Sequence, residues 1–401
     1  MSIIEIQDLC NNKIVFESCT GSLKSQNKEY QIKKAKIYLS DNNDVIMEGC
    51  SDNIFISQDE DKVFSGIFTD NQNRIISFDK LYIYKTPISN DSFIEFEAII
   101  LNATIKNGII DKEALAQIYV ILTTIEFCGN EFIEIDGKRD RALNKFTLPP
   151  SIELSLINYK FQGISNSTGF IKLTTTINKW ETEWPEIIKR LYYILSFSAS
   201  NFVSMPLTYF IYDDGSKKIE MHSSSQETGR GSSIFYLKHP GVMYNVINTI
   251  YPNYFKHEQA LDLNKLFHYY IMMKNTHYLE NAYLLGCVFM EGVKHSYAKK
   301  YKNYPENKGG YFLKAPNRIY TFKELIKEVY NEFRLRDGDE EFIKYRNEVI
   351  HQGSIDLPFP EMERQKEQLE ITIEKLLLNI LGFKGEYYWD RESNDWIKYQ
   401  P

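Results

Sequence analysis

The sequence predicts an α+β protein, in which a β-rich N-terminal part and a helical C-terminal part are joined by a smaller segment that mixes both. Three observations support this prediction: strand-like segments before residue 175, a change of pattern between 176 and 252, and apolar stripes at helical spacing thereafter. At 401 residues the chain exceeds one typical hydrophobic core, so we expect two or three domains.

The predicted N-terminal domain spans residues 1–175 and consists of antiparallel strands. Segments rich in β-branched and aromatic residues alternate with Asn, Asp and Gly clusters, which is the usual chemistry of turns between strands. These segments read KIVFES, IKKAKIYLS, NIFISQ, KVFSGIF, RIISFDKLYIYK, FIEFEAIIL, YVILTTIEF and FIKLTTTI. The pattern indicates a sandwich or a barrel and does not decide between them.

The predicted middle segment, residues 176–252, is a small α/β region. An amphipathic helix is expected across EWPEIIKRLYYILSFSASNFV, followed by strands in LTYFIYDD and KKIEMHS. The Ser- and Gly-rich stretch SSSQETGRGSS then predicts an exposed loop.

Residues 253–401 form the predicted all-α domain with a C-terminal tail. Apolar residues recur there at spacings of three and four, which places them on one face of each helix and predicts a helical bundle. The stripes contain Leu266, Phe267, Tyr270 and Met273; Leu279, Ala282, Tyr283, Gly286, Phe289, Met290, Val293 and Tyr297; Phe322, Leu325, Ile326, Val329, Tyr330 and Phe333; and Leu369, Ile373, Leu376, Leu377 and Ile380.

The stretch KYRNEVIHQG places an arginine and a histidine five positions apart near the end of a predicted helix. Asp337 and Glu340 resemble a capping box at its start, and Gly353 is a natural residue to follow its last turn. Residues five apart are about 140° apart on an α-helix, so Arg346 and His351 flank one polar edge. For an arbitrary pair of this kind, a cap and a solvated charge are the ordinary explanation.

The order Arg346, Asn347, three residues, His351 resembles the RNxxxH motif of HEPN superfamily ribonucleases, which is often followed closely by glycine. The departure is Gln352, where many members already have glycine. The resemblance covers about residues 254–383. A β-rich region before a C-terminal HEPN domain is also similar, in architecture only, to ApeA-type anti-phage proteins.

The resemblance implies a metal-independent endoribonuclease of abortive infection, a toxin regulated by its N-terminal domain. RNA carries its own 2′-OH nucleophile, so the enzyme needs proton transfer and stabilisation of a negatively charged phosphorane. His351 would move the proton, Arg346 would hold phosphate oxygens, and Asn347 would orient one of the two. The resemblance also implies a homodimer in which two copies of the motif meet, with RNA, tRNA among the candidates, as substrate.

Composition limits the other partners and cofactors. The formal net charge is -7, so RNA binding requires a local basic patch. We expect one between residues 294 and 323, with Lys299, Lys300, Lys302 and Lys308 as RNA-binding residues. No metal ion, other cofactor or membrane partner is expected. The five cysteines show no CxxC pairing, and the first residues lack the pattern of a secretory signal, so we expect a cytoplasmic protein with reduced thiols.

Two other functions remain open at this stage. One is a HEPN module that binds RNA or a nucleotide without cutting, with the β-rich domain as a sensor of a phage-derived trigger. The other is an interaction scaffold, which would leave the basic region without a role. Retention of both Arg346 and His351 favours the enzyme, because a binding-only module has no need of the pair.

Overall fold

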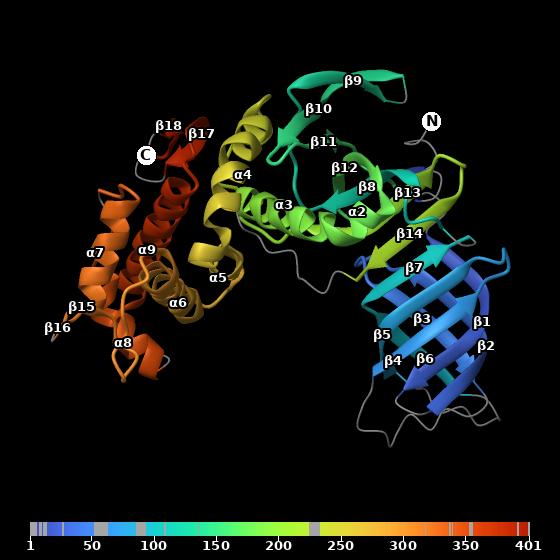
Figure 1. Ribbon diagram of the computed structural model, residues 1–401, viewed down its shortest axis with the longest axis horizontal. Coiled ribbons are helices and arrows are strands. Elements are labelled where there is room, and N and C mark those ends of the chain that lie inside the picture. Colours follow the sequence, from blue (N-terminus) through green and yellow to red (C-terminus); the bar gives the residue numbers. More distant parts are fainter. Residues whose placement is uncertain are drawn as a thin grey trace. The chain divides into compact units, whose positions relative to one another are not determined.

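The computed structural model describes residues 6–7, 10, 14–25, 28–51, 63–85, 94–107, 110–135, 137–223, 233–316, 318–336, 338, 340–352, 356–390 and 393–399. The chain forms two compact units, which we call the barrel unit and the helical unit (Figure 1). The barrel unit consists of Met1–Thr147, Glu153–Pro185 and Val203–Glu227. The helical unit consists of Leu148–Ile152, Glu186–Phe202 and Thr228–Pro401. Residues of the predicted middle segment belong to both units, and its boundaries at 175 and 252 stay predictions.

The N-terminal strands close into a barrel, because β4 pairs with β1 on one side and with β5 on the other (Figure 1). Every pairing in the barrel is antiparallel, in the order β4-β1-β2-β3-β6-β5. The strands are β1 (Val15–Ser25), β2 (Lys28–Leu39), β3 (Val45–Ser51), β4 (Val63–Thr69), β5 (Ile75–Lys85) and β6 (Ile94–Ile100). The predicted antiparallel β-rich N-terminal part is therefore confirmed, and its closed portion is a barrel.

The sheet continues beyond the barrel through a pairing of β5 with β7. From there the order is β7-β14-β13-β8-β12-β11-β10-β9, so the two strands predicted in the middle segment insert into the N-terminal sheet. The strands are β7 (Asn102–Lys106), β8 (Leu115–Thr123), β9 (Glu131–Ile135), β10 (Lys138–Leu148), β11 (Ile152–Asn158), β12 (Ser167–Thr176), β13 (Ser204–Tyr212) and β14 (Lys217–His222). A short helix α2 (Ile177–Thr182) follows β12.

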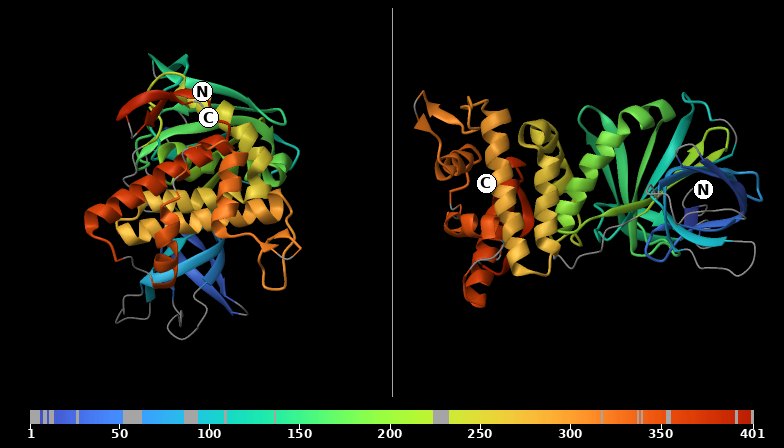
Figure 2. Two further views of the ribbon diagram at one scale, coloured as in Figure 1. Left: turned by 90° about the vertical axis from the view of Figure 1, so that its left-hand side faces the viewer. Right: turned by 90° about the horizontal axis from the view of Figure 1, so that it is seen from below.

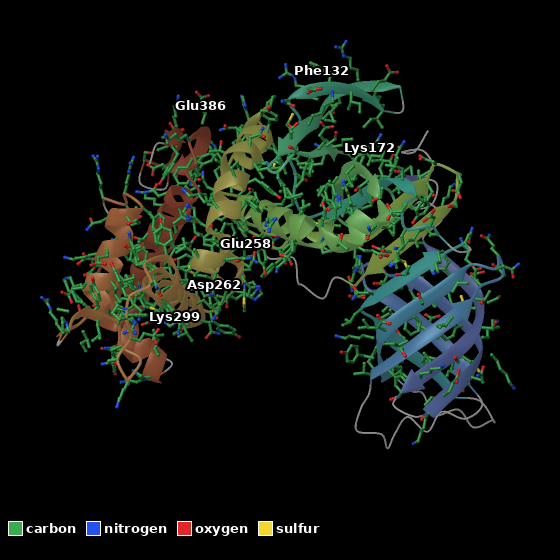
Figure 3. All side chains as sticks on the ribbon, viewed as in Figure 1. Phe132, Lys172, Glu258, Asp262, Lys299 and Glu386 are labelled. Atoms are coloured by element: carbon green, nitrogen blue, oxygen red, sulfur yellow. The ribbon has the colours of Figure 1, made fainter. Side chains whose placement is uncertain are left out.

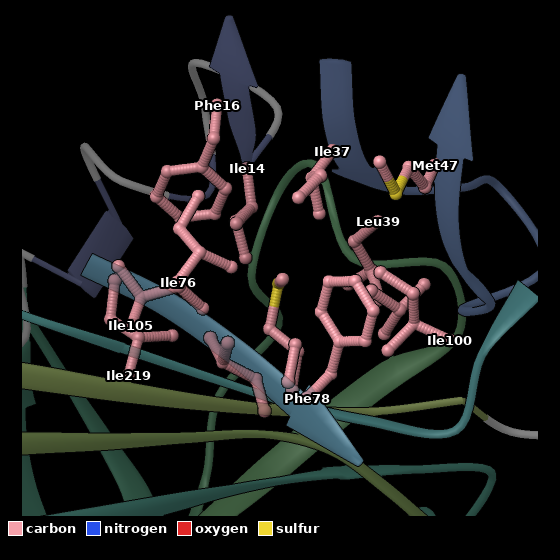
Figure 4. Packing of buried hydrophobic residues seen from close by; sticks show 14 of the residues in the cluster. Ile14, Phe16, Ile37, Leu39, Met47, Ile76, Phe78, Ile100, Ile105 and Ile219 are labelled. Atoms are coloured by element: carbon pink, nitrogen blue, oxygen red, sulfur yellow. The ribbon is translucent and has the colours of Figure 1, made fainter. Parts of the chain in front are cut away.

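The barrel closes around apolar side chains (Figure 4), and along strands such as β4 buried side chains alternate with more exposed ones. In β2, Ile37 is buried while its neighbour Lys36 is exposed, as expected when successive side chains point to opposite faces. The rings of Phe68 and Phe78 stack inside with centroids 5.7 Å apart. Gly66 is needed beside them, since a Cβ there would lie 2.5 Å from the Phe78 ring.

Not every strand was expected. The sequence pattern missed β3, β7, β9, β10 and β11, and the predicted strand NIFISQ lies outside the described residues. The region predicted to be all-α also contains four short strands, β15 to β18. Most of the predicted loop SSSQETGRGSS lies outside them as well. The basic turn at Gly137 is the tip of the β9–β10 hairpin.

The helical unit contains most of the helices (Figures 1 and 2). They are α3 (Trp184–Ala199), α4 (Val242–Leu261), α5 (Leu263–Asn275), α6 (Leu279–Ser296), a π-helical turn (Tyr297–Tyr301), α7 (Phe322–Glu332), α8 (Phe342–Gln352) and α9 (Phe359–Ile380). Two short hairpins accompany them, β15 (Leu313–Ala315) with β16 (Arg318–Ile319), and β17 (Gly385–Asp390) with β18 (Asp395–Tyr399). No helix within the described ranges is both long and apolar enough to cross a lipid bilayer.

The predicted apolar stripes form the core of this unit. Nearly all of their residues are buried in α5, α6, α7 and α9, while Leu279 and Phe322 are half-buried at the first positions of α6 and α7. The predicted C-terminal helical region, and with it the α+β class, is confirmed.

Candidate functional site

The motif lies on α8, which docks on α6 and α7 through its first turn. Phe342 is fully buried, and its ring meets that of Phe322 edge-on with centroids 6.0 Å apart. The Tyr283 hydroxyl donates a hydrogen bond to the Phe342 carbonyl oxygen at 3.3 Å. The predicted caps Asp337 and Gly353 lie outside the described residues, and the helix itself runs from Phe342 to Gln352.

Arg346 is held in a half-buried position between the helices. One terminal nitrogen, Nη2, forms an ion pair with the Glu291 carboxylate of α6, and the guanidinium lies over the Phe322 ring of α7 at 4.2 Å from its centroid. Only 20% of the Arg346 side chain is exposed. Burial lowers the pKa of the Arg346 guanidinium, but arginine is so strongly basic that the group stays charged at neutral pH. This arginine is thus a fixed cation.

The structure joins Asn347 to Arg346 and leaves His351 apart from both. The Arg346 Nη1 group donates to Asn347 Oδ1 at 2.7 Å, so the amide of Asn347 orients the arginine. His351 lies in the last turn of α8 with an exposed side chain, and it makes no hydrogen bond or ion pair with any described residue. The imidazole is therefore accessible to a substrate or to a second protein chain.

Three of the four lysines expected to bind RNA are paired with carboxylates. Two of these carboxylates come from outside the basic stretch of sequence, in the α4–α5 connection and in α7 (Figure 3 labels Asp262 and Lys299). The pairs are Lys299 with Glu306 at 3.1 Å, Lys300 with Asp262, and Lys302 with Glu332 at 2.6 Å. Lys308 is exposed and forms no ion pair within the described part of the chain.

Other basic residues of this stretch are also paired with carboxylates. Lys314 and Arg318 share the Glu324 carboxylate at 2.9 and 2.6 Å, and Lys323 pairs with Glu340 at 2.9 Å. The positive charge that accumulates along the sequence is therefore largely neutralised in space. The role of the four lysines in RNA binding stays a prediction.

Glu291, Lys294 and Phe322 complete the site, and sequence reasoning did not assign them to it. The carboxylate partner of Arg346 is Glu291, in the second half of α6. One signal was present: Glu291 is the only charged residue between Glu280 and Lys294, in an otherwise apolar run. A lone carboxylate beside a buried stripe indicates a partner on another element.

The barrel unit carries a pocket of its own, with a volume of about 560 Å³. Charged side chains of neighbouring strands line it, among them Lys34, Lys36, Glu48, Glu95 and Glu97. Lys36 faces Glu48 across β2 and β3, and Glu48 faces Glu97 across β3 and β6. The pocket belongs to a different unit from the motif and offers a mixed-charge surface.

No known protein family matches the chain, and neither does any curated protein or solved structure.

Proposed function

We propose that the protein is a metal-independent endoribonuclease of anti-phage defence, acting in the cytoplasm by abortive infection, and that its helical unit is a HEPN bundle. The observation that carries the proposal is the placement of the RNxxxH residues on α8. Arg346 is anchored between α6 and α7, whereas His351 is exposed in the last turn of the same helix. A fixed cation and an accessible proton carrier on the same helix suit phosphodiester cleavage.

In this proposal, His351 accepts the proton of the RNA 2′-OH, whose oxygen then attacks the adjacent phosphorus. The bond from phosphorus to the 5′-oxygen breaks, and a second protonated imidazole gives that oxygen its proton. Arg346 stabilises the negative charge on the phosphorane, and Asn347 fixes the guanidinium through its 2.7 Å hydrogen bond. The products are a 2′,3′-cyclic phosphate and a 5′-OH end.

The second imidazole would come from His351 of a second copy of the chain, in a homodimer. Each chain carries one RNxxxH, and a twofold contact near α8 would bring two of them together. Apolar side chains near the motif support such a contact: Ile350, next to His351, is 36% exposed, and Phe359, at the start of α9, is 67% exposed.

The barrel unit is the proposed regulatory part, which responds to a phage-derived trigger. Its mixed-charge pocket supplies a place where a polar ligand or a segment of a partner could bind. The pocket is the observation that supports this role. The trigger would carry charges complementary to Lys34, Lys36, Glu48, Glu95 and Glu97.

The test is cleavage of total cellular RNA by the full chain in EDTA, with the ends of the products mapped. Wild type should cut and leave 2′,3′-cyclic phosphate and 5′-OH ends. His351→Ala should lose about 10²- to 10⁴-fold in rate, the usual contribution of one acid–base group. Arg346→Lys should also fail, because an ammonium group cannot reproduce the planar fork. His277→Ala, at another exposed histidine, is the matched control and should cleave normally.

Three outcomes would contradict the proposed nuclease activity. They are full activity in a folded His351→Ala protein, a requirement for Mg²⁺, and 5′-phosphate products. Binding of RNA without cleavage by the wild type would instead support the non-catalytic HEPN module.

The dimer has its own test, in which wild-type chains are mixed with an excess of His351→Ala chains. Most wild-type chains then sit in mixed dimers that lack one imidazole, so activity should fall below simple dilution. Proportionality to the wild-type concentration, under conditions where subunits demonstrably exchange, would show that each chain works alone.

A further inference from the structure

A single carboxylate, that of Glu291, bridges two cations beside the motif helix. Its Oε2 atom accepts from Lys294 Nζ at 2.6 Å, and its Oε1 atom pairs with Arg346 Nη2. Both cations also lie over the Phe322 ring, Arg346 at 4.2 Å and Lys294 at 5.1 Å from the centroid. Two positive side chains therefore share one aromatic ring and one negative partner.

Both terminal nitrogens of the Arg346 guanidinium already have partners in this arrangement. Nη1 donates to Asn347 Oδ1, and Nη2 faces Glu291. Nε is buried and has no hydrogen-bond partner among the described residues. A phosphate group binds arginine through two parallel N–H groups. A phosphate that binds the Nη1–Nη2 edge therefore competes with Asn347 and Glu291 for these two nitrogens.

Of these two residues, Glu291 is the one whose side chain a phosphate group can replace chemically. Its carboxylate and a phosphodiester both carry one negative charge and two acceptor oxygens, so one can replace the other between the same cations. Glu291 is 26% exposed, so its carboxylate can turn toward solvent without being buried unpaired. Lys294 and Arg346 together carry two positive charges against one, and this excess attracts an anion.

We propose that Glu291 is an internal competitor for RNA, which holds Arg346 and Lys294 together until a phosphodiester displaces it. Lys294 is then a second phosphate-binding residue, contacting the same group as Arg346. The inference rests on the proposed function, because it takes the ligand to be an RNA phosphate. It goes beyond that function by naming a restraint and an additional cation at the same site.

The experiment measures binding rather than cleavage. The probe is a fluorescent single-stranded RNA with every 2′-hydroxyl methylated, which cannot be cut, titrated with the full-length chain in fluorescence anisotropy at several salt concentrations. Glu291→Gln removes the competing charge while keeping the shape, and should tighten binding about three- to tenfold. Glu280→Gln, an exposed glutamate in the first turn of the same helix, is the control and should leave affinity unchanged.

Two further variants separate competition from a structural effect. Glu291→Asp keeps the charge and should stay near wild-type affinity. Lys294→Met keeps the aliphatic stem against Phe322 and should weaken binding. It should also reduce the slope of log affinity against log salt by about 0.7, the contribution of one phosphate contact with a single strand.

Weaker or unchanged binding by a folded Glu291→Gln protein would overturn the inference, and so would a lack of RNA binding by all variants. The two proposals fail differently. If wild type binds RNA but never cuts it while Glu291→Gln binds more tightly, the nuclease is wrong and the competitor stands. If wild type cuts RNA and Glu291→Gln binds no better, the nuclease stands and the competitor is wrong.

Discussion

The barrel core and the helical core bury different chemistry. The barrel closes around apolar side chains such as Ile37, Phe68 and Phe78, each at most 4% exposed (Figure 4). In the helical unit, Lys274 of α5 lies against Glu370 and Glu374 of α9, at 2.5 and 3.1 Å. These three side chains are 5%, 2% and 0% exposed, so an ion-pair network lies inside the core.

This difference predicts which substitutions most reduce the stability of each unit. An apolar core loses stability in proportion to the volume removed, because a void forfeits packing contacts. A buried ion network loses little while every charge has its partner, but removal of one charge leaves another in a medium that cannot solvate it. Tyr270 belongs to the same network: its hydroxyl donates to Glu374 at 2.9 Å, and burial raises its pKa, so it remains a donor.

The largest effect is therefore expected from Lys274→Met, which removes the cation and keeps most of its volume. The Glu370 and Glu374 carboxylates would lose a buried partner, and the helical unit should lose about 3–5 kcal/mol of stability. Hydrogen exchange of the α5 and α9 amides measures this loss for that unit alone, which matters because a chain with two units need not unfold in one step.

Lys344→Met is the matched control for the buried lysine. Lys344 pairs with Glu341 at 3.2 Å and is 66% exposed, so its loss should cost at most about 1 kcal/mol. A double change, Lys274→Met with Glu374→Gln, should recover part of the stability by removing one orphaned charge. If Lys274→Met destabilised no more than Lys344→Met, the network would have no special importance.

A smaller effect is expected from Ile37→Val in β2 of the barrel. The change removes one methylene from a fully buried side chain, which typically costs about 0.5–1.5 kcal/mol. Exchange of the β2 amides should report the loss. Ile67→Val, at a residue of β4 that is 61% exposed, should leave the barrel unchanged. Equal effects at Ile37 and Ile67 would contradict the assignment of Ile37 to the core.

The sequence anticipated several elements in which burial follows the period of the backbone. Ile37 and Lys36 alternate in β2, and Leu325, Ile326 and Val329 recur at helical spacing in α7, so both elements were predicted. The strands β9 and β10 were missed, because exposed charged side chains at their hairpin hide the alternation. Closure of the barrel could not be predicted from the sequence either. It depends on the pairing of β4 with two strands, and no local pattern specifies that pairing.

The residues of the site also fall into two groups, those that the sequence predicted and those that it missed. The sequence predicted that Arg346, Asn347 and His351 lie on one short helix, because helical spacing is a local property of the chain. Glu291 was missed as the partner of Arg346, although it is the only charge in its run. For the lysines, the sequence overstated the positive charge. A window of sequence counts the charge of Lys302 but omits Glu332 of α7, which neutralises it.

By itself, the sequence determined the α+β class, the positions of α3 and of α5 to α9, and the helical setting of the RNxxxH residues, whereas α2 and α4 were not predicted. These properties follow from hydrophobic periodicity, which is a local consequence of 3.6 or 2 residues per repeat. Only the tertiary structure decided which carboxylate holds Arg346, which lysines are neutralised, and that the N-terminal strands close into a barrel. Each of these is a pairing between residues far apart in the chain, and the packing of whole elements selects the partner that a charge or a strand edge meets.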